Sequence, residues 1–160
     1  MLPVLIGQVR SLMQSASSPS RIILAEDNDA DAMMLEEALQ RHSVDYELVR
    51  AKDGEHALDL VEALESDAGQ PAPALFILDL HLPRRDGLEV IQRIRTGPRC
   101  REIPIVALSG SDAPKDRENV QRHAVTYFRK PSDFDSYLKL GIVVKEAISG
   151  PLRKDLRGVA

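Results

Sequence analysis

Short apolar runs alternate with longer segments of helical periodicity from Arg21 onward. Short runs bounded by polar or turn residues predict buried strands, and the periodic segments predict helices that cover them. The predicted strands are Ile22–Ala25, Tyr46–Val49, Leu75–Leu78, Ile105–Leu108 and Val125–Phe128. Strands that alternate with helices form βαβ units, so we predict a parallel sheet.

The segments between and after these strands carry apolar residues at helical spacing. Helices are predicted at Ala30–Arg41, Glu55–Leu64, Leu88–Ile94, Asp116–His123 and Tyr137–Ile148. The first places its apolar side chains broadly on one side, at Met33, Met34, Ala38 and Leu39. The fourth is polar apart from Val120, so only a narrow stripe of it can face the sheet. The pattern predicts an α/β fold, a doubly wound sheet of five parallel strands with five helices.

Composition divides the chain into three parts. Ser15–Ser20 is small, polar and interrupted by proline, as in a flexible connector. We therefore predict an N-terminal extension and linker at residues 1–20, one domain at 21–149 and a C-terminal tail at 150–160. Leu2, Leu5 and Val9 recur at helical spacing before the connector. That spacing leaves two interpretations open, an amphipathic helix that docks on a partner or a second copy, and a frayed tail.

The apolar start of the chain is not typical of a signal peptide, because Pro3, Gly7 and Gln8 interrupt it and no positive charge precedes it. No stretch approaches the ~20 apolar residues that span a bilayer. The lone cysteine, Cys100, cannot form an internal disulfide and is interpreted as a loop thiol. These features predict a soluble protein of the cytoplasm.

Charge and aromatic content argue against nucleic acid as a partner. The 160 residues carry a formal net charge of −4, and the basic residues are scattered along the chain. Binding to nucleic acid needs a basic face or a row of stacking aromatics. Aromatic residues make up only 4% here, with no tryptophan.

Four of the predicted strands run directly into reactive polar groups. Glu26 and Asp27 follow the first strand, Asp79 the third, Ser109 the fourth, and Lys130 comes shortly after the fifth. A doubly wound sheet builds its site outside the carboxyl ends of its strands. Carboxylates gathered there would repel one another without a cation. Mg²⁺, which prefers oxygen ligands, and the Lys130 ammonium are the expected cations.

Such a site can carry out phosphoryl transfer. An ionised aspartate beside a metal can attack a phosphoryl group, because the metal and a lysine neutralise the developing charge. Ser109 can hydrogen-bond a phosphoryl oxygen, and Gly110 keeps the approach open. Singly, each residue also has a structural explanation, since Glu26 and Asp27 could cap the next helix and Lys130 could be solvated. Their joint arrival at one sheet edge favours the functional interpretation.

Four separated motifs, in this order, resemble the receiver domain of two-component response regulators. Ile22-Ile-Leu-Ala-Glu-Asp-Asn is similar to the acidic pair after the first strand, and LFILDLHLPRRDG, from Leu75, to the phosphoacceptor strand and its loop. Val106-Ala-Leu-Ser-Gly is similar to the switch hydroxyl motif, and Tyr127-Phe-Arg-Lys-Pro to the lysine-proline step. The resemblance covers about residues 21 to 148. It implies a flavodoxin-like sheet with strand order 2-1-3-4-5.

The resemblance also implies how the metal and the phosphoryl group are held. Asp27, Asp79 and the backbone carbonyl of His81 would coordinate Mg²⁺, and Glu26 would act through water. Asp79 would be the phosphoacceptor, with Lys130 beside it. The protein would not be an enzyme beyond phosphoryl transfer onto, and hydrolysis from, its own Asp79.

A switch is implied as well. The Ser109 hydroxyl would move toward the phosphoryl group, and the Tyr127 ring would turn inward to fill the space. An aromatic residue on a strand also fits a plain core role, so Tyr127 keeps both interpretations. Pro131 would follow a cis Lys130–Pro131 bond that aims the lysine into the pocket.

Contact with other proteins is the expected output. After the last predicted helix only residues 150–160 remain, too few for a DNA-reading domain. We expect a stand-alone receiver that is phosphorylated by a sensor histidine kinase. Its last two helices and fifth strand would bind a partner or form a homodimer. The loop Asp67–Pro73 and the LPRRDG turn resemble those of single-domain regulators paired with phytochrome-type kinases.

Two other functions stay open. A phosphorelay intermediate, which passes the group to a histidine phosphotransfer protein, would carry the same motifs. Phosphatases of the haloacid dehalogenase type also use an aspartate at a strand end, but they need a second aspartate two residues on. This chain has His81 there. We hypothesise that His81 and Ser111 set the rate of dephosphorylation.

Overall fold

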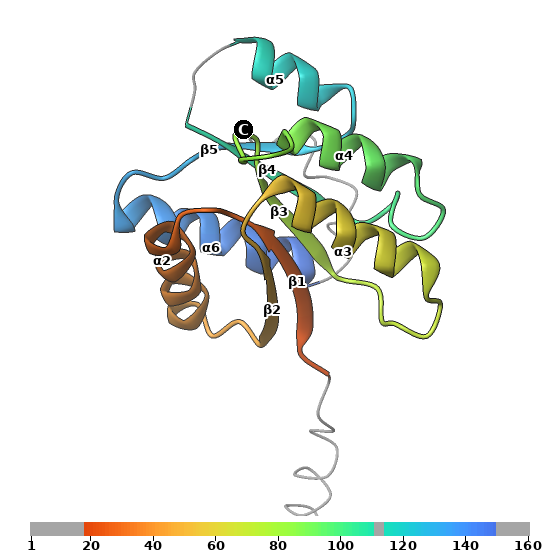
Figure 1. Cartoon of the computed structure of the whole chain (residues 1–160). Coiled ribbons are helices and arrows are strands. Elements are labelled where there is room, and N and C mark those ends of the chain that lie inside the picture. The colour runs from red at the N-terminus through yellow and green to blue at the C-terminus, as the bar shows by residue number, and fades with distance from the viewer. Residues whose placement is uncertain (1–17, 111–113, 150–160) are drawn as a thin grey trace, which may run out of the picture.

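A parallel sheet organises the computed structural model, which describes residues 18–110 and 114–149. Its five strands lie in the order β2-β1-β3-β4-β5 (Figure 1). They are β1 Ser20–Ala25, β2 Tyr46–Ala51, β3 Leu75–Asp79, β4 Ile105–Ser109 and β5 Thr126–Arg129. The helices are α2 Asp29–Arg41, α3 Gly54–Ser66, α4 Gly87–Thr96, α5 Pro114–Gln121 and α6 Phe134–Ile148. The predicted α/β class, the parallel sheet and the 2-1-3-4-5 order are confirmed.

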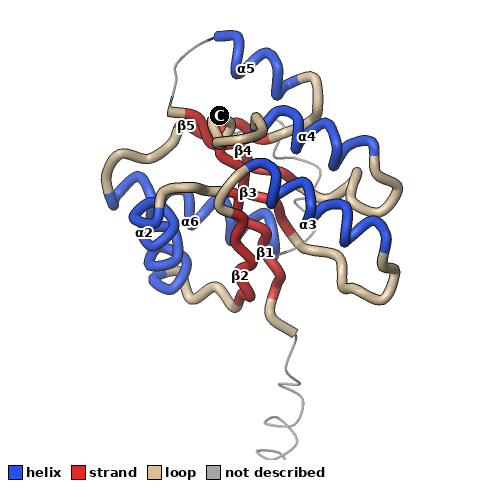
Figure 2. Tube along the Cα trace, viewed as in Figure 1, coloured by secondary structure: helices blue, strands red, loops and turns tan. Residues whose placement is uncertain are grey.

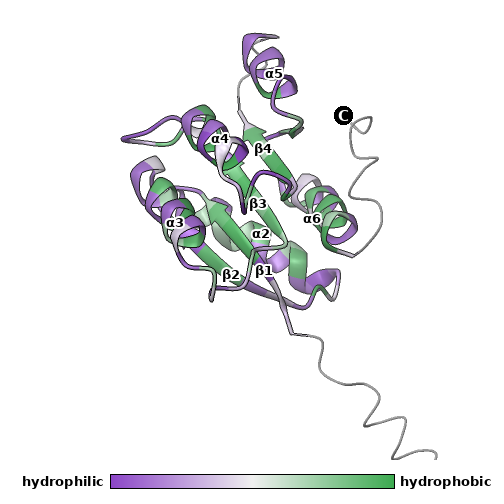
Figure 3. Ribbon diagram, turned by 90° about the vertical axis from the view of Figure 1, so that its right-hand side faces the viewer, coloured by the Kyte–Doolittle hydropathy of each residue, from purple (hydrophilic) through white to green (hydrophobic). Residues whose placement is uncertain are grey.

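Helices cover both faces of the sheet, in three layers (Figure 2). On one face, Ile22, Leu24 and Ile77 pack against α2 and α6. On the other, Ile23, Phe76 and neighbouring strand residues pack against α3 and α4, and α5 adds Val120. The strands are accordingly green and the outer sides of the helices largely purple in Figure 3. Because β3 is covered on both faces, all five of its residues are buried, which explains its continuous apolar run.

Helix starts are set by capping side chains. Asn28 accepts a hydrogen bond from the backbone of Asp31, and Asp53, Asp86 and Asp133 cap α3, α4 and α6 in the same way. A capping side chain satisfies a backbone N–H that has no partner inside the helix. These three later helices therefore begin one to three residues before the predicted starts.

One predicted helix face is partly wrong. On α2, Met33 is 70% exposed, although the sequence placed it on the apolar side. The residues that α2 buries are Ala32, Leu35, Ala38 and Leu39. Their spacing follows one helical stripe, which packs against the sheet and α6, and Met33 falls outside it.

Several predictions concern the chain ends and the lone cysteine. The segment that precedes the connector, the tail at 150–160 and Ser111 lie outside the described residues. Cys100 lies in the loop between α4 and β4, as predicted, and its side chain is buried. Burial, together with the Glu65 carboxylate, raises the pKa of this thiol to about 11. None of the described helices is long and apolar enough to span a membrane.

The start of α4 lies directly against the end of β3. A Cβ at Gly87 would come 2.3 Å from the backbone oxygen of Asp79 and 2.7 Å from the Cα of Leu80. Neither atom is a flexible side-chain end, so a larger residue would have to displace the helix or the strand. Glycine at this position thus holds α4 close to the edge where the acidic residues gather.

We predict that Gly87→Ala lowers the free energy of unfolding by about 3 kcal/mol, the upper range for overpacking. The higher helix propensity of alanine, worth about 1 kcal/mol, would offset only part of this. Urea unfolding followed by circular dichroism measures the change. Gly110→Ala is the control, because a Cβ there meets no described atom within 4 Å. Equal midpoints for both variants would contradict the prediction.

Candidate functional site

Three strand ends bring two acids and a lysine together. Glu26 follows β1, Asp79 ends β3, and Lys130 follows β5. The Lys130 Nζ lies 2.7 Å from Asp79 Oδ2 and 2.9 Å from Glu26 Oε2. Glu26 and Asp79 are only 2% and 3% exposed, so their charges are compensated mainly inside the protein. The structure thus joins three residues that are far apart in the sequence.

A group of oxygen ligands at this edge could hold a divalent cation. Carboxylate oxygens of Glu26, Asp27 and Asp79 all lie within 4.8 Å of one another. Asp27 is exposed, so the group opens to solvent and a bound ion could keep some of its waters. Hard oxygen donors with water access are the coordination that Mg²⁺ and similar ions prefer. The residues present therefore fit a metal ion of this class.

Both Glu26 and Lys130 have pKa values above their ordinary ones, for different reasons. Burial raises the pKa of Glu26 above its ordinary value, although hydrogen bonds from the backbone of Asn28 and from Lys130 oppose the shift. For Lys130, burial acts to lower the pKa, but hydrogen bonds to Asp79, Glu26 and Asp31 outweigh it and raise the pKa. The lysine therefore stays charged at neutral pH and serves as the counterion of the site.

The orientation of the Lys130 side chain does not depend on a cis peptide bond to Pro131. The described residues contain no cis peptide bond, so the predicted cis Lys130–Pro131 bond is wrong. The backbone N–H of Lys130 donates to the Ser109 carbonyl at 2.8 Å, and its ammonium is held by carboxylates. These contacts aim the side chain in the trans form, which is also the lower-energy isomer for most X–Pro bonds. Pro131 itself is buried beside them.

Ser109 and His81 meet an acid that the sequence did not single out. The Ser109 hydroxyl, fully buried at the end of β4, donates to Asp116 Oδ2 at 3.1 Å. His81 Nε2 lies 3.1 Å from the same oxygen and 3.5 Å from the Ser109 hydroxyl. Asp116 belongs to α5, which is mostly polar, so nothing in the sequence distinguished it from the other polar positions of this helix. The contact ties α5 to the end of β4.

Tyr127 lies on β5 and is 9% exposed within the core cluster on the α3 and α4 side. The guanidinium of Arg117, from α5, lies 5.1 Å from the centre of its ring. A small cavity of about 50 Å³ adjoins the same region, lined by residues that include His81, Asp116 and Val120. The predicted switch residues Ser109 and Tyr127 thus both contact α5.

Two further residues at the site were missed by sequence reasoning. Asp31, on α2, places Oδ2 3.0 Å from the Lys130 ammonium. Tyr137, on α6, donates its hydroxyl hydrogen to Asp31 Oδ1 at 2.9 Å. Asp31 comes four residues after Asp27, in the first turn of α2, and this spacing was the available signal. No pattern in the sequence indicated Tyr137, which only the packing of α6 on α2 brings near.

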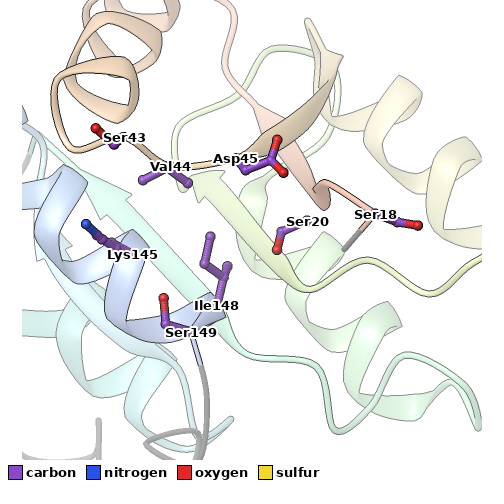
Figure 4. Close-up of a pocket in the computed structure, with 8 residues that line it drawn as sticks. All are labelled: Ser18, Ser20, Ser43, Val44, Asp45, Lys145, Ile148 and Ser149. Carbon is purple, nitrogen blue, oxygen red and sulfur yellow. The ribbon is translucent and has the colours of Figure 1, made fainter. Parts of the chain in front are cut away.

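The larger cavity lies elsewhere, at the start of β1 and β2 (Figure 4). It measures about 240 Å³, and its lining is mostly serine and aliphatic. Asp45 and Lys145 are its only charged lining residues within the described part of the chain. None of the acids around Lys130 lines it, so it forms no part of the candidate site.

Comparisons with known proteins agree with the geometry. The family model of the response regulator receiver domain matches residues 22–140. The chain is 35% identical over 132 residues to the probable methanogenesis regulatory protein FilR2 of Methanothrix harundinacea, which covers 82% of this chain and 84% of that protein. It is 32% identical over 130 residues to the response regulator Rcp1 of Synechocystis sp., with coverage of 80% and 88%.

Solved structures give the same result. The phosphorylated cyanobacterial phytochrome response regulator RcpA superposes with a TM-score of 0.73 at 30% identity, covering 83% of this chain and 96% of that one. The Mn²⁺-bound form of Rcp1 superposes with a TM-score of 0.70 at 29% identity, covering 89% and 98%. The matched residues include the strand ends that carry Glu26, Asp79 and Lys130. This chain therefore belongs to the response regulator receiver domain family of two-component signalling systems.

Proposed function

We propose that Asp79 accepts a phosphoryl group from a histidine kinase in a Mg²⁺-dependent reaction, and that phosphorylation changes which protein the domain binds. The observation that carries this proposal is the pairing of a nearly buried Asp79 with Lys130 at 2.7 Å, beside two further acids. A buried aspartate paired only for stability would not need a neighbouring acidic group open to solvent. A phosphoacceptor needs such an acidic group beside it, because the group helps to bind the metal.

The chain's own residues account for the proposed transfer. An oxygen of Asp79 attacks phosphorus, the bond from phosphorus to the donor nitrogen breaks, and an acyl phosphate forms. One carboxylate oxygen of Asp79 already accepts the backbone N–H of His81 at 2.8 Å, which fixes the orientation of the group. Lys130 supplies a positive charge beside the other oxygen. A bound divalent ion would neutralise negative charge that develops on the transferred oxygens.

We assign the metal to Mg²⁺, held by Asp27, Asp79 and the backbone carbonyl of His81, with Glu26 acting through water. The oxygen cluster supports a hard divalent ion, and the relative Rcp1 has a Mn²⁺-bound form. Both ions take oxygen ligands in similar sites. The protein would then perform phosphoryl transfer onto, and hydrolysis from, its own Asp79 only.

Ser109 and Tyr127 are proposed as the switch, with Gly110 and Pro131 as structural supports. The contacts of Ser109 with Asp116 and of Tyr127 with Arg117 link both residues to α5. Movement of the Ser109 hydroxyl toward a phosphoryl group would break its bond to α5. A partner, or a second copy in a homodimer, would read the change on the face of α5, β5 and α6.

The kinase is proposed to be of the phytochrome type, acting in the cytoplasm, because RcpA is a phytochrome response regulator. A phosphorelay intermediate uses the same site and differs only in the acceptor of the phosphoryl group. A phosphatase of the haloacid dehalogenase type has less support. Its second aspartate would stand at His81, whose side chain instead contacts Asp116.

Labelling with acetyl phosphate tests the phosphoacceptor. With Mg²⁺ present, the wild-type protein should take up one acid-labile phosphoryl group per chain, and Asp79→Asn should take up none. Removal of the metal with EDTA should also abolish labelling. Asp59→Asn, at an exposed acid on α3, is the matched control and should label normally. Repeated turnover of p-nitrophenyl phosphate by the wild type would favour the phosphatase instead.

We predict that Lys130→Met lowers the free energy of unfolding at pH 7 by about 3–5 kcal/mol, since it leaves buried carboxylates without their counterion. The pKa of Lys130 is raised in the folded state, so its contribution is complete below its unfolded pKa near 10.5 and is lost as the pH rises further. The wild type should therefore lose stability above about pH 10.5, and the variant should lack this decline. At acid pH the difference should shrink as Glu26, whose pKa is raised by burial, becomes protonated and no longer needs a counterion.

Urea unfolding between pH 4 and 11 measures both trends. Lys139→Met, at an exposed lysine on α6, is the control and should leave stability nearly unchanged. Equal stability of Lys130→Met and wild type at pH 7 would mean that the desolvation of the ammonium cancels its ion pairs.

His81 and Ser111 are predicted to set the lifetime of the acyl phosphate. Replacing either by alanine removes a polar group that can orient the attacking water, so the phosphoryl lifetime should lengthen severalfold. The measurement is the loss of radioactive label after removal of the phosphodonor. His56→Ala, at an exposed histidine on α3, serves as control. Unchanged lifetimes in both site variants would refute the assignment.

A further inference from the structure

We infer that Asp31 and Tyr137 form a positioning pair that fixes the Lys130 ammonium in the phosphoryl-transfer site. The inference rests on the proposed function of that site and assigns it two residues outside its four sequence motifs. The observation is a continuous chain of contacts from β5 through α2 to α6. Lys130 Nζ lies 3.0 Å from Asp31 Oδ2, and the Tyr137 hydroxyl lies 2.9 Å from Asp31 Oδ1.

Asp31 completes the hydrogen bonding of the ammonium. A lysine ammonium has three N–H donors and no acceptor. Three carboxylates surround it, with nitrogen–oxygen distances of 2.7 Å to Asp79, 2.9 Å to Glu26 and 3.0 Å to Asp31. Each donor can therefore point at a charged acceptor, and charge-assisted bonds of this kind are the stronger ones. Without Asp31, one N–H would lose its charged partner and the ammonium could rotate and shift.

Asp31 also differs from the other two carboxylates in what else it could bind. The group that could hold a divalent ion consists of Glu26, Asp27 and Asp79, and Asp31 is not a member. A metal there would draw on the oxygens of Glu26 and Asp79, which are two of the three partners of Lys130. Of the three carboxylates that contact Lys130, only Asp31 is not a member of the group that could also bind a metal ion.

Contacts on both sides hold Asp31 in place. Its backbone N–H donates to the Asn28 side chain at 3.1 Å, which fixes the start of α2. Its Oδ1 accepts the hydrogen of the Tyr137 hydroxyl. Tyr137 is 3% exposed and lies in the core between α2 and α6. Burial, with Asp31 and Glu26 nearby, raises the pKa of the Tyr137 hydroxyl, so it remains a donor at physiological pH. The acid therefore has one favoured orientation, with its other oxygen toward Lys130.

Two simpler explanations must be separated from positioning. Asp31 could act only as one more negative charge near the site, or the contacts could contribute only to folding stability. Asp29 offers a matched control for the charge, because it is also an acid in the first turn of α2. It pairs instead with Arg50 at 2.7 Å and with Lys52. A readout on the ammonium itself tests positioning without reference to activity.

The experiment compares Asp31→Asn, Tyr137→Phe and Asp29→Asn. The first readout is the ¹H–¹⁵N NMR signal of the Lys130 ammonium in metal-free protein, identified by its loss in Lys130→Met. A held ammonium exchanges its protons slowly and gives a signal, whereas a mobile one does not. We expect the signal in the wild type and in Asp29→Asn, and its broadening or loss in Asp31→Asn and Tyr137→Phe.

The second readout is the rate of labelling by acetyl phosphate with Mg²⁺. Asp31→Asn should label about tenfold more slowly, as expected when a group that acts in the reaction is displaced. Tyr137→Phe should also slow labelling, but by a smaller factor, and Asp29→Asn should leave the labelling rate unchanged. In the Lys130→Met background, Asp31→Asn should cause no further loss, because a positioning residue acts only through the residue it holds.

Three results would overturn the inference. The first is an unchanged NMR signal in Asp31→Asn. The second is an equal loss of labelling rate in Asp31→Asn and Asp29→Asn. The third is a slower labelling rate on adding Asp31→Asn to the Lys130→Met variant. A wild-type protein that takes no label would refute the proposed function of the site. The NMR comparison would still decide whether Asp31 and Tyr137 hold the lysine.

Discussion

Electrostatic repulsion between buried carboxylates is the constraint on which the site depends. Glu26 and Asp79 are almost completely removed from water, and like charges in such a place would oppose folding unless a cation lies between them. Lys130 supplies that cation, and its own burial is compensated by the same carboxylates. The buried acids and the lysine therefore each depend on the other for charge compensation. With the exposed Asp27, the acidic groups at this edge fit a divalent ion.

The fold meets this constraint through the order of its strands. β1 and β5 are on opposite sides of the central pair β3 and β4, and the residues after them converge over the end of β3. α4 begins so close to Asp79 that its first residue has no room for a side chain. Asp79 consequently stands at the end of a fully buried strand, and Glu26 and Lys130 stand on the loops that follow β1 and β5.

Contacts lead away from the site along two routes. One runs through Ser109 to Asp116 on α5, a helix whose only buried residue is Val120. The other runs through Lys130 and Asp31 to Tyr137 in the firmly packed core of α6. The weak packing of α5 favours movement, because few buried contacts oppose it. The strong packing of α6 favours fixed geometry. The site thus contacts both a firmly packed helix, α6, and a helix with a single buried residue, α5.

The sequence by itself determined the class of the fold and the centre of the site. A strand covered on both faces must be apolar throughout, so β3 was evident from Leu75–Leu78, and the rule that sites gather at strand ends selected Asp79 and Lys130. The site residues that stand on helices could not be predicted in this way. Polar positions are common on a helix, and only the packing of α2 against α6 and of α5 above β4 decided that Asp31, Tyr137 and Asp116 reach the site. The same packing decided that Met33 faces solvent. Local patterns record which face of a strand is buried, but which helix side chain meets which depends on how the layers are placed in space.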